Sequence, residues 1–189
     1  TRDMALLESN PFGISWGVDD AILVGLGSEG IWRVPAAGGP AESVVSVEPG
    51  EWAHGPQLLP DGESVLYTLR PRGTTSWDDA EVVVQSLKTG ARQVVVERGR
   101  DARYVSTGHV VYGVEGGLSA IAYDARTQRV TSAPGRLVDG VGFAAGVPAS
   151  GAVQYDVSDN GTLVYAPGAG TTDNLALLWV DRQGHEAPI

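Results

Sequence analysis

Four similar segments follow one another along the chain, and each reads as a short apolar strand, a tight turn and a second apolar strand. They are residues 14–26, 56–69, 102–114 and 155–167, with turn centres at Asp19-Asp20, Asp61-Gly62, Thr107-Gly108 and Asn160-Gly161. Asp-Gly and Asn-Gly pairs favour β-hairpins, because both central residues of such turns need positive φ angles. Counted from Asp20 to Gly62, Gly108 and Gly161, the turn centres are 42, 46 and 53 residues apart. The chain is therefore built from repeated hairpins.

A second pair of predicted strands follows each hairpin, so that every repeat contains four short strands. The third strands are residues 31–34, 81–87, 118–123 and 175–180, and the fourth strands are residues 43–47, 93–96, 128–131 and 185–189. Four strands in roughly 40 to 50 residues are typical of a β-propeller blade. The sequence therefore predicts an all-β protein, a β-propeller of about four four-stranded antiparallel blades, at residues 12–47, 53–97, 101–138 and 151–189.

The two ends of the chain bear on whether the ring closes. Residues 1–8 include the apolar stretch Met4-Ala5-Leu6-Leu7 and are expected to form an outer strand of a preceding or closing blade. Residues 1–189 then make either a whole small ring or part of a larger propeller. A part of a ring leaves open blade edges, and such edges favour pairing of two copies into a homodimer.

The composition agrees with an all-β fold and excludes several classes of protein. The 189 residues include 26 Gly and 11 Pro, which break helices, and no long segment shows helical periodicity. No apolar run is long enough to cross a membrane, and no signal peptide is expected at the start. The absence of Cys excludes disulfides and thiolate catalysis.

The charge balance limits the partners. The formal net charge is −10, whereas proteins that bind nucleic acid carry basic faces that neutralise phosphates. Nucleic acid and anionic membranes are therefore not expected as partners. A simpler explanation of the acidity is that it keeps the protein soluble.

Four stretches carry a resemblance to a known family. Residues 59–67, LPDGESVLY, resemble the repeated signature of TolB-type, PD-repeat (WD-like) propellers, and residues 158–165 resemble a second copy. Residues 30–39 and residues 177–184 are similar to the third strand and turn of that family. The chain is most similar to the propeller region of bacterial serine/threonine protein kinases. The resemblance implies a sensor or scaffold role in a larger signalling protein, in an extracytoplasmic (periplasmic) location.

Two motifs look catalytic but occur in the wrong context. Residues 13–17, GISWG, match the nucleophile elbow, yet a turn and a second strand follow where the elbow needs a helix. Residues 25–30, GLGSEG, match the dinucleotide fingerprint, yet residues 31–35 read as a strand instead of the required helix. Both glycine-rich stretches are expected to be parts of hairpins, and we predict no catalytic residues.

Neither a metal nor a cofactor is expected. His54, His109 and His185 are too far apart in the sequence for a paired-histidine metal site. Asp19-Asp20 and Asp78-Asp79 lack the spaced pattern of a calcium loop.

One face of the predicted propeller carries the long connections. In an antiparallel blade, loops between second and third strands share a face with loops between blades, and here both kinds are long: residues 48–54, 70–79, 97–103, 139–151 and 168–174. Loops on a rigid scaffold carry most binding sites, and Trp and Arg dominate interface hot spots. The predicted binding residues on this long-loop face are Trp52, His54, Arg70, Arg72, Trp77, Arg98, Arg100 and Arg103.

The arginines of this face allow two interpretations. They form a basic site for a protein, a peptide or a small anionic ligand, or they pair with Glu97, Asp78, Asp79 and Asp101. The function that we expect is non-catalytic binding. The alternatives are a lactonase-like metal-dependent hydrolase and a gating propeller of a fused peptidase.

Overall fold

The residues that the structure describes are all-β apart from one turn of 3₁₀ helix, η1 (Trp77–Asp79). A computed structural model describes residues 9–17, 19–144, 150–158, 160–168, 178–181 and 185–188. These residues contain seventeen strands in four small antiparallel sheets, which are the blades of a β-propeller. The predicted fold class is therefore confirmed. Residues 1–8, including the predicted outer strand, lie outside the described residues.

Blades 1 and 2 have the four-stranded order that the hairpin pattern predicts. Blade 1 contains β1 (Ile14–Trp16), β2 (Ala21–Gly25), β3 (Ile31–Pro35) and β4 (Glu42–Val45). Blade 2 contains β5 (Trp52–Leu58), β6 (Ser64–Arg70), β7 (Glu81–Ser86) and β8 (Arg92–Val96). In each blade the strands pair in chain order. The predicted turn centres Asp20 and Gly62 have φ angles of 54° and 68°, as tight hairpin turns require.

Blade 3 differs from the prediction at its outer edge. It contains β9 (Arg100–Val105), β10 (His109–Val114), β11 (Gly117–Asp124), β12 (Arg129–Val130) and β13 (Gly135–Asp139). The expected fourth strand at residues 128–131 is only the two-residue β12, which pairs with the end of β11. The rest of that edge is filled by β13, which pairs with Gly117–Ala120. Because β11 is long, two short strands share its outer edge.

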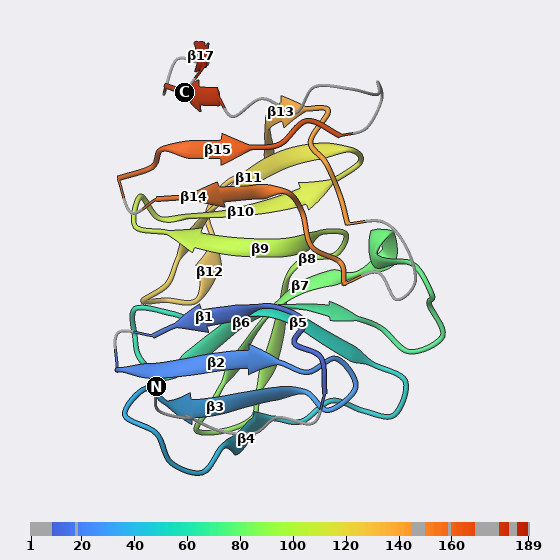
Figure 1. Ribbon diagram of the computed structural model, residues 1–189, viewed down its shortest axis with the longest axis vertical. Helices are drawn as coiled ribbons and strands as arrows, with labels where there is room; N and C mark the ends of the chain where they lie inside the picture. Colours follow the sequence, from blue (N-terminus) through green and yellow to red (C-terminus); the bar gives the residue numbers. More distant parts are fainter. Residues whose placement is uncertain are drawn as a thin grey trace.

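Blade 4 contains β14 (Tyr155–Val157), β15 (Leu163–Tyr165), β16 (Leu178–Val180) and β17 (Glu186–Pro188), paired in chain order. Its hairpin turn has Gly161 at a φ angle of 84°. The four blades follow one another along the long axis of the molecule, with blade 1 at the bottom of Figure 1 and β17 at the top. The first and last blades therefore lie at opposite ends of the described arrangement.

Side chains alternate along each strand, so a blade can place apolar residues on two faces, as blades 1, 2 and 3 do. We call the face toward the next blade the leading face and the face toward the previous blade the trailing face. In β10, Val110 belongs to the cluster shared with blade 2, whereas its neighbour Val111 belongs to the cluster shared with blade 4. In β6, Val65 and Leu66 likewise pack toward blades 1 and 3. The period of two along a strand thus assigns adjacent residues to different junctions.

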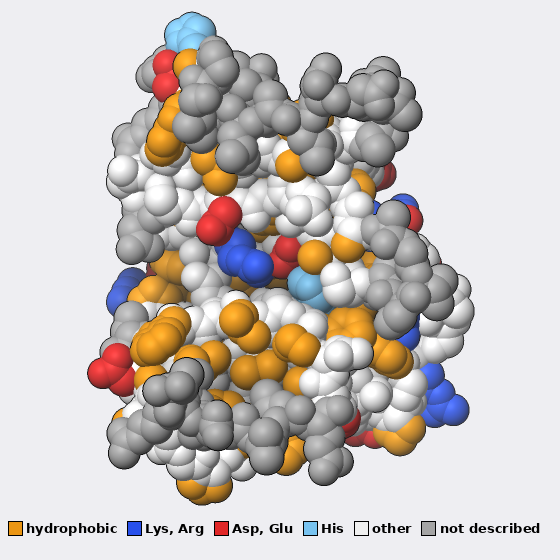
Figure 2. Space-filling view, viewed as in Figure 1, with side chains coloured by type: hydrophobic (Ala, Val, Ile, Leu, Met, Phe, Trp, Pro, Cys, Tyr) orange, Lys and Arg blue, Asp and Glu red, His pale blue; other side chains and the backbone are white. Residues whose placement is uncertain are grey.

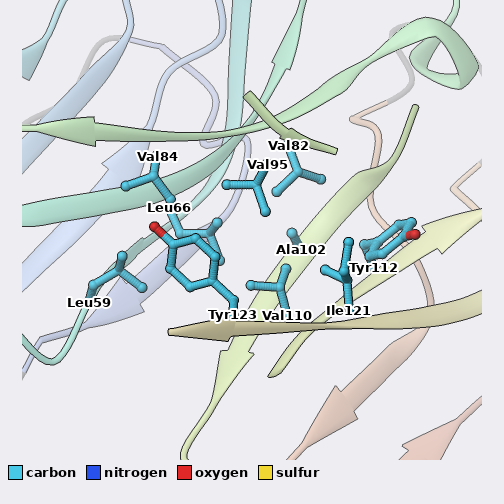
Figure 3. Packing of buried hydrophobic residues seen from close by; sticks show 10 residues of the cluster. All are labelled: Leu59, Leu66, Val82, Val84, Val95, Ala102, Val110, Tyr112, Ile121 and Tyr123. Atoms are coloured by element: carbon cyan, nitrogen blue, oxygen red, sulfur yellow. The ribbon is translucent and has the colours of Figure 1, made fainter. Parts of the chain in front are cut away.

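The junction of blades 2 and 3 is the largest buried cluster. Figure 3 shows its side chains meeting between the two sheets. Blade 2 with its first turn contributes Leu59, Leu66, Val82, Val84 and Val95, and blade 3 contributes Ala102, Val110, Tyr112, Ile121 and Tyr123. All ten are buried, and the burial of their apolar side chains between the two sheets stabilises the junction.

This junction predicts a large cost for removing Leu66, which is fully buried. Leu66→Ala should lower the free energy of unfolding by about 2 to 5 kcal/mol, because a cavity remains where the side chain packed. The matched control is Leu137→Ala on β13, where the Leu137 side chain is 50% exposed. This substitution should lower the free energy of unfolding by about 1 kcal/mol or less. Urea titration followed by circular dichroism measures both. Equal costs for the two variants would contradict the assignment of Leu66 to the core.

Candidate functional site

The predicted binding residues lie on or directly below the long-loop face. The connection between β6 and β7 carries Arg72 and η1, and the connection between β8 and β9 carries Arg98. The sequence placed all of these residues in loops. For Trp52, His54, Arg70, Arg100 and Arg103 this prediction is wrong, because strand pairing extends further than expected. Trp52 and His54 lie in β5, Arg70 ends β6, and Arg100 and Arg103 lie in β9.

Arg70 connects two of the predicted tryptophans. Its guanidinium carbon lies 4.8 Å from the ring centre of Trp52 and 5.3 Å from that of Trp77. Arginine is attracted to the faces of indole rings at such distances. Trp77 is buried and meets His54 edge-on, with ring centres 5.6 Å apart. Trp52, Arg70, Trp77 and His54 therefore form one continuous aromatic and cationic cluster, which the sequence predicted only as separate residues.

His54 is a buried, neutral histidine. It is 2% exposed, and burial lowers the pKa of its imidazole to about 4, an effect that Asp101 opposes and that Arg103 and Arg100 reinforce. Its Nδ1 lies 3.8 Å from Oδ1 of Asp101, which is too far for a hydrogen bond. Within the described residues this Nδ1 has no hydrogen-bond partner. The side chain is therefore held by packing against Trp77 more than by polar contacts.

Asp101 joins blade 3 to blade 4 and orients Arg103. Its Oδ2 accepts a hydrogen bond from the Val153 N–H at 2.8 Å, and its backbone carbonyl accepts one from the Tyr155 hydroxyl. Its Oδ1 lies 2.9 Å from Nη1 of Arg103. Asp101 has a φ angle of 48°, a strained value for a residue other than glycine. The surrounding contacts fix this strained residue where the inner strands of the blades meet.

A pocket of about 430 Å³ opens among the long connections, near the cluster around Arg70. It is lined by Trp77, Asp78, Arg98, Gly99, Arg100, Gly113, Val114, Glu115, Gly116 and Phe143. The Arg100 guanidinium lies 4.0 Å from the ring centre of Phe143, and its Nη2 contacts Oδ1 of Asp78 at 2.9 Å. Burial lowers the pKa of Arg100, while Asp78 and Asp101 oppose that effect. The pocket thus combines two arginines and two carboxylates with two aromatic walls.

The structure separates the two interpretations of the arginines residue by residue. Arg100 and Arg103 pair with Asp78 and Asp101, as the second interpretation expects. Arg72 and Arg98 form no ion pair with the carboxylates of the described residues. Arg98 lines the pocket, whereas Arg72 packs beside Gly50 at the rim of another loop. Arg98 and Arg100 are therefore the predicted arginines that reach the pocket together.

Sequence reasoning missed the other side of the pocket. Phe143 follows β13 and forms an isolated bridge with Val153, outside the repeated hairpin pattern. The turn Glu115-Gly116 was also missed, although both residues have positive φ angles, 47° and 74°. A Gly-containing pair between two apolar runs is the signal that finds such a turn, since three of the four predicted turn centres contain Gly.

The two catalytic-looking motifs are parts of blade 1. Ser15 lies in the middle of β1, paired with Leu23 of β2, and no helix follows it. The glycine-rich stretch Leu26–Gly30 is the turn between β2 and β3, closed by a hydrogen bond from the Leu26 N–H to the Gly30 carbonyl. Both motifs therefore arise from hairpin geometry.

The described part of the chain lacks two kinds of feature. It contains no group of three or more His, Cys, Asp or Glu residues placed to hold a metal ion. It also contains no helix that is long and apolar enough to cross a membrane.

The comparisons with known proteins support the fold. No protein-family model matches the sequence, and no curated protein matches it. Among solved structures, the chain is similar to TolB from Acinetobacter baumannii, with a TM-score of 0.64 and 19% identity over 95% of this chain. It is also similar to regucalcin, a calcium-binding protein from Agrobacterium tumefaciens, with a TM-score of 0.61 and 14% identity over 92% of this chain.

A third similar structure is puromycin hydrolase, with a TM-score of 0.60 and 15% identity over 93% of this chain. The chain spans only part of these proteins: 43% of the TolB chain, 57% of regucalcin and 32% of puromycin hydrolase. At such identities the similarity establishes the architecture. The chain is a β-propeller. These neighbours include a protein named as a hydrolase and one named as a calcium-binding protein, so they do not decide the activity.

The buried His54 predicts that the fold weakens in mild acid. The unfolded chain binds a proton near pH 6.5, whereas the folded chain keeps His54 neutral down to about 4. Below pH 6.5 the unfolded state therefore binds more protons, and the free energy of unfolding should fall by about 3 kcal/mol between pH 6.5 and pH 4. Urea titrations at a series of pH values measure this loss.

Two variants isolate the contribution of His54. His54→Gln should remove most of the loss between pH 6.5 and pH 4, whatever its effect on stability at neutral pH. His109→Gln, at a histidine that contacts Thr107 outside the site, should leave the loss intact. A His54→Gln protein that weakens in acid as steeply as the wild type would show that other groups are responsible.

Proposed function

We propose that this propeller is a non-catalytic binding module, and that the pocket of the long-loop face binds a carboxylate of an acidic peptide or protein. The supporting observation is the environment of Arg100. Its side chain is 13% exposed and stacks on Phe143, while its ion-pair partner Asp78 is 62% exposed. Arg100 is therefore a largely buried anion-binding group, and the carboxylate of Asp78, from the same chain, occupies it.

Exchange of that internal group for a ligand is chemically simple. Asp78 belongs to η1 at the surface, so it can turn into water while a ligand carboxylate takes its place on Arg100. Guanidinium groups bind carboxylates with two parallel hydrogen bonds, which are stronger than neutral ones. Arg98 adds a second positive charge, and Trp77 and Phe143 supply apolar walls for the side chains that flank the carboxylate.

The wider setting of the module is part of the same proposal. The resemblance to propellers of bacterial serine/threonine kinases supports a sensor or scaffold role in a larger signalling protein outside the cytoplasm. The similarity to TolB supports a propeller of this general kind. The pocket lining supports a binding role, because it places Arg98 and Arg100 beside apolar walls.

The proposal predicts opposite effects for two substitutions at the pocket. Arg98→Ala should weaken binding of a glutamate-rich peptide by about ten- to a hundredfold, because a charged hydrogen-bond donor is lost. Asp78→Asn should strengthen binding of the same peptide, because the competing carboxylate is removed. Isothermal titration calorimetry measures both, and the affinity should fall as salt is added.

The matched control is Arg129→Ala on β12, at the exposed outer edge of blade 3. It removes the same charge from the protein and should leave the affinity unchanged. If Arg129→Ala and Arg98→Ala weaken the peptide equally, the peptide responds only to net charge. No detectable binding of the glutamate-rich peptide to either the wild type or Asp78→Asn would reject the pocket as a carboxylate site.

A further inference from the structure

The pocket of the long-loop face contains charged side chains of both signs. Its described lining includes two arginines, Arg98 and Arg100, and two carboxylates, Asp78 and Glu115. Arg100 and Asp78 pair with each other. Within the described residues, neither Arg98 nor Glu115 forms an ion pair, although both line the same pocket. The pocket therefore offers a ligand one positive and one negative side chain.

Glu115 lies in the tight turn between β10 and β11. Val114 pairs with Gly117, so this connection of blade 3 consists of Glu115 and Gly116. The corresponding connection of blade 2, between β6 and β7, spans residues 71–80. Both residues of the short turn line the pocket, and Glu115 is exposed. The carboxylate of Glu115 is therefore accessible to a bound molecule.

The backbone at Glu115 has a conformation that glutamate does not favour. Its φ angle is 47° and that of Gly116 is 74°, and two-residue turns of this kind favour Asn or Asp followed by Gly. The guanidinium of Arg136 fixes the turn, because it donates to the carbonyls of Val114 and Glu115 at 2.8 and 3.1 Å. Arg136 also pairs with Asp139. The fold alone thus favours a shorter residue at position 115, and ligand binding is a reason for a glutamate there.

The charges of the pocket select the charge of the ligand. The two positive and two negative side chains of the described lining balance one another. A ligand that carries only a carboxylate brings a negative charge close to Glu115, whereas a ligand that also carries an ammonium group gives Glu115 a partner. On the described part of the face that Figure 2 displays, acidic and basic side chains likewise lie interspersed. This pattern favours recognition by individually placed charges.

We propose that the pocket binds the free N-terminus of an acidic peptide or protein, an inference that rests on the carboxylate site proposed above. The side-chain carboxylate of the first or second ligand residue binds Arg98 and Arg100, and the α-ammonium group binds the carboxylate of Glu115. An α-amino group is mostly charged at neutral pH. Hydrogen bonds between charged groups are stronger than neutral ones, and capture of a terminal amine is a recurring mode of peptide recognition.

The size of the pocket agrees with the end of a chain. Its volume of about 430 Å³ lies in the lower part of the range of ligand pockets, which is about 300 to 1,000 Å³. Such a space suits a terminal residue and its neighbour better than a long internal segment. Trp77 and Phe143 supply apolar walls for the aliphatic part of the first side chain. An internal segment of the same composition has no ammonium group to offer Glu115.

Two versions of one glutamate-rich peptide test the inference, one with a free N-terminus and one acetylated. In isothermal titration calorimetry, the wild type should bind the free peptide about tenfold more tightly, because acetylation removes the terminal charge. Glu115→Gln should bind the two peptides with nearly equal affinity. This loss of discrimination is the coupling expected of two groups in contact.

Two further variants separate recognition from charge and from folding. Glu63→Gln removes the same charge at the exposed turn between β5 and β6 and should keep the tenfold preference. Glu115→Asn introduces a residue that the turn favours, so its midpoint in urea should rise while the preference is lost. A merely structural role of Glu115 does not produce this combination.

The outcomes distinguish this inference from the proposed function. A wild type that binds the free and acetylated peptides equally, while Arg98→Ala weakens both, would overturn the N-terminal inference and leave the carboxylate site in place. Glu115→Gln protein that keeps the preference would overturn the inference as well. If neither peptide binds the wild type, the carboxylate site itself is rejected, and the N-terminal inference with it.

Discussion

The whole architecture depends on the fact that blades 1, 2 and 3 are small sheets with apolar side chains on both faces. Such a sheet cannot bury its two faces by itself and is stable only between neighbours. In β6, for example, Val65 packs toward blade 1 and Leu66 toward blade 3, so the strand has no solvent face. The same requirement operates at each of the three junctions between the described blades.

Close approach of the inner strands adds polar connections to this packing. The Gly55 N–H of blade 2 donates to the Phe12 carbonyl, at the start of blade 1, and a Cβ at Gly13 would lie 2.7 Å from the Gly55 Cα. Gly55 in turn faces the Asp101 carboxylate, which binds the Val153 N–H. The contacts run through all four blades. Glycine is needed at the first junction because any side chain would separate the strands, whereas Asp101 uses its side chain as the connection.

Local signals made the repeat predictable, and long-range packing decided the rest. The Asp61-Gly62 turn was evident because its conformational preference depends on two adjacent residues. The position of β13 was not evident from the sequence. Residues Gly135–Asp139 pair with β11 only after the chain has left that edge at β12. In the candidate site, Trp77, Arg98 and Arg100 were identified from their types and positions. Phe143 was missed because it lies outside the hairpin pattern, and the burial of Arg100 depends on blades that meet only in three dimensions.

The assignment of adjacent residues to different junctions has a consequence for how disturbances spread. Val110 and Val111 are adjacent in the sequence, yet Val110 packs against blade 2 and Val111 packs against blade 4. A change at one of them therefore acts on one side of the sheet, and it reaches the other side only by moving the sheet as a whole. The stabilising interactions therefore couple each blade to its neighbours in the chain, as the interfaces between the units of a solenoid do.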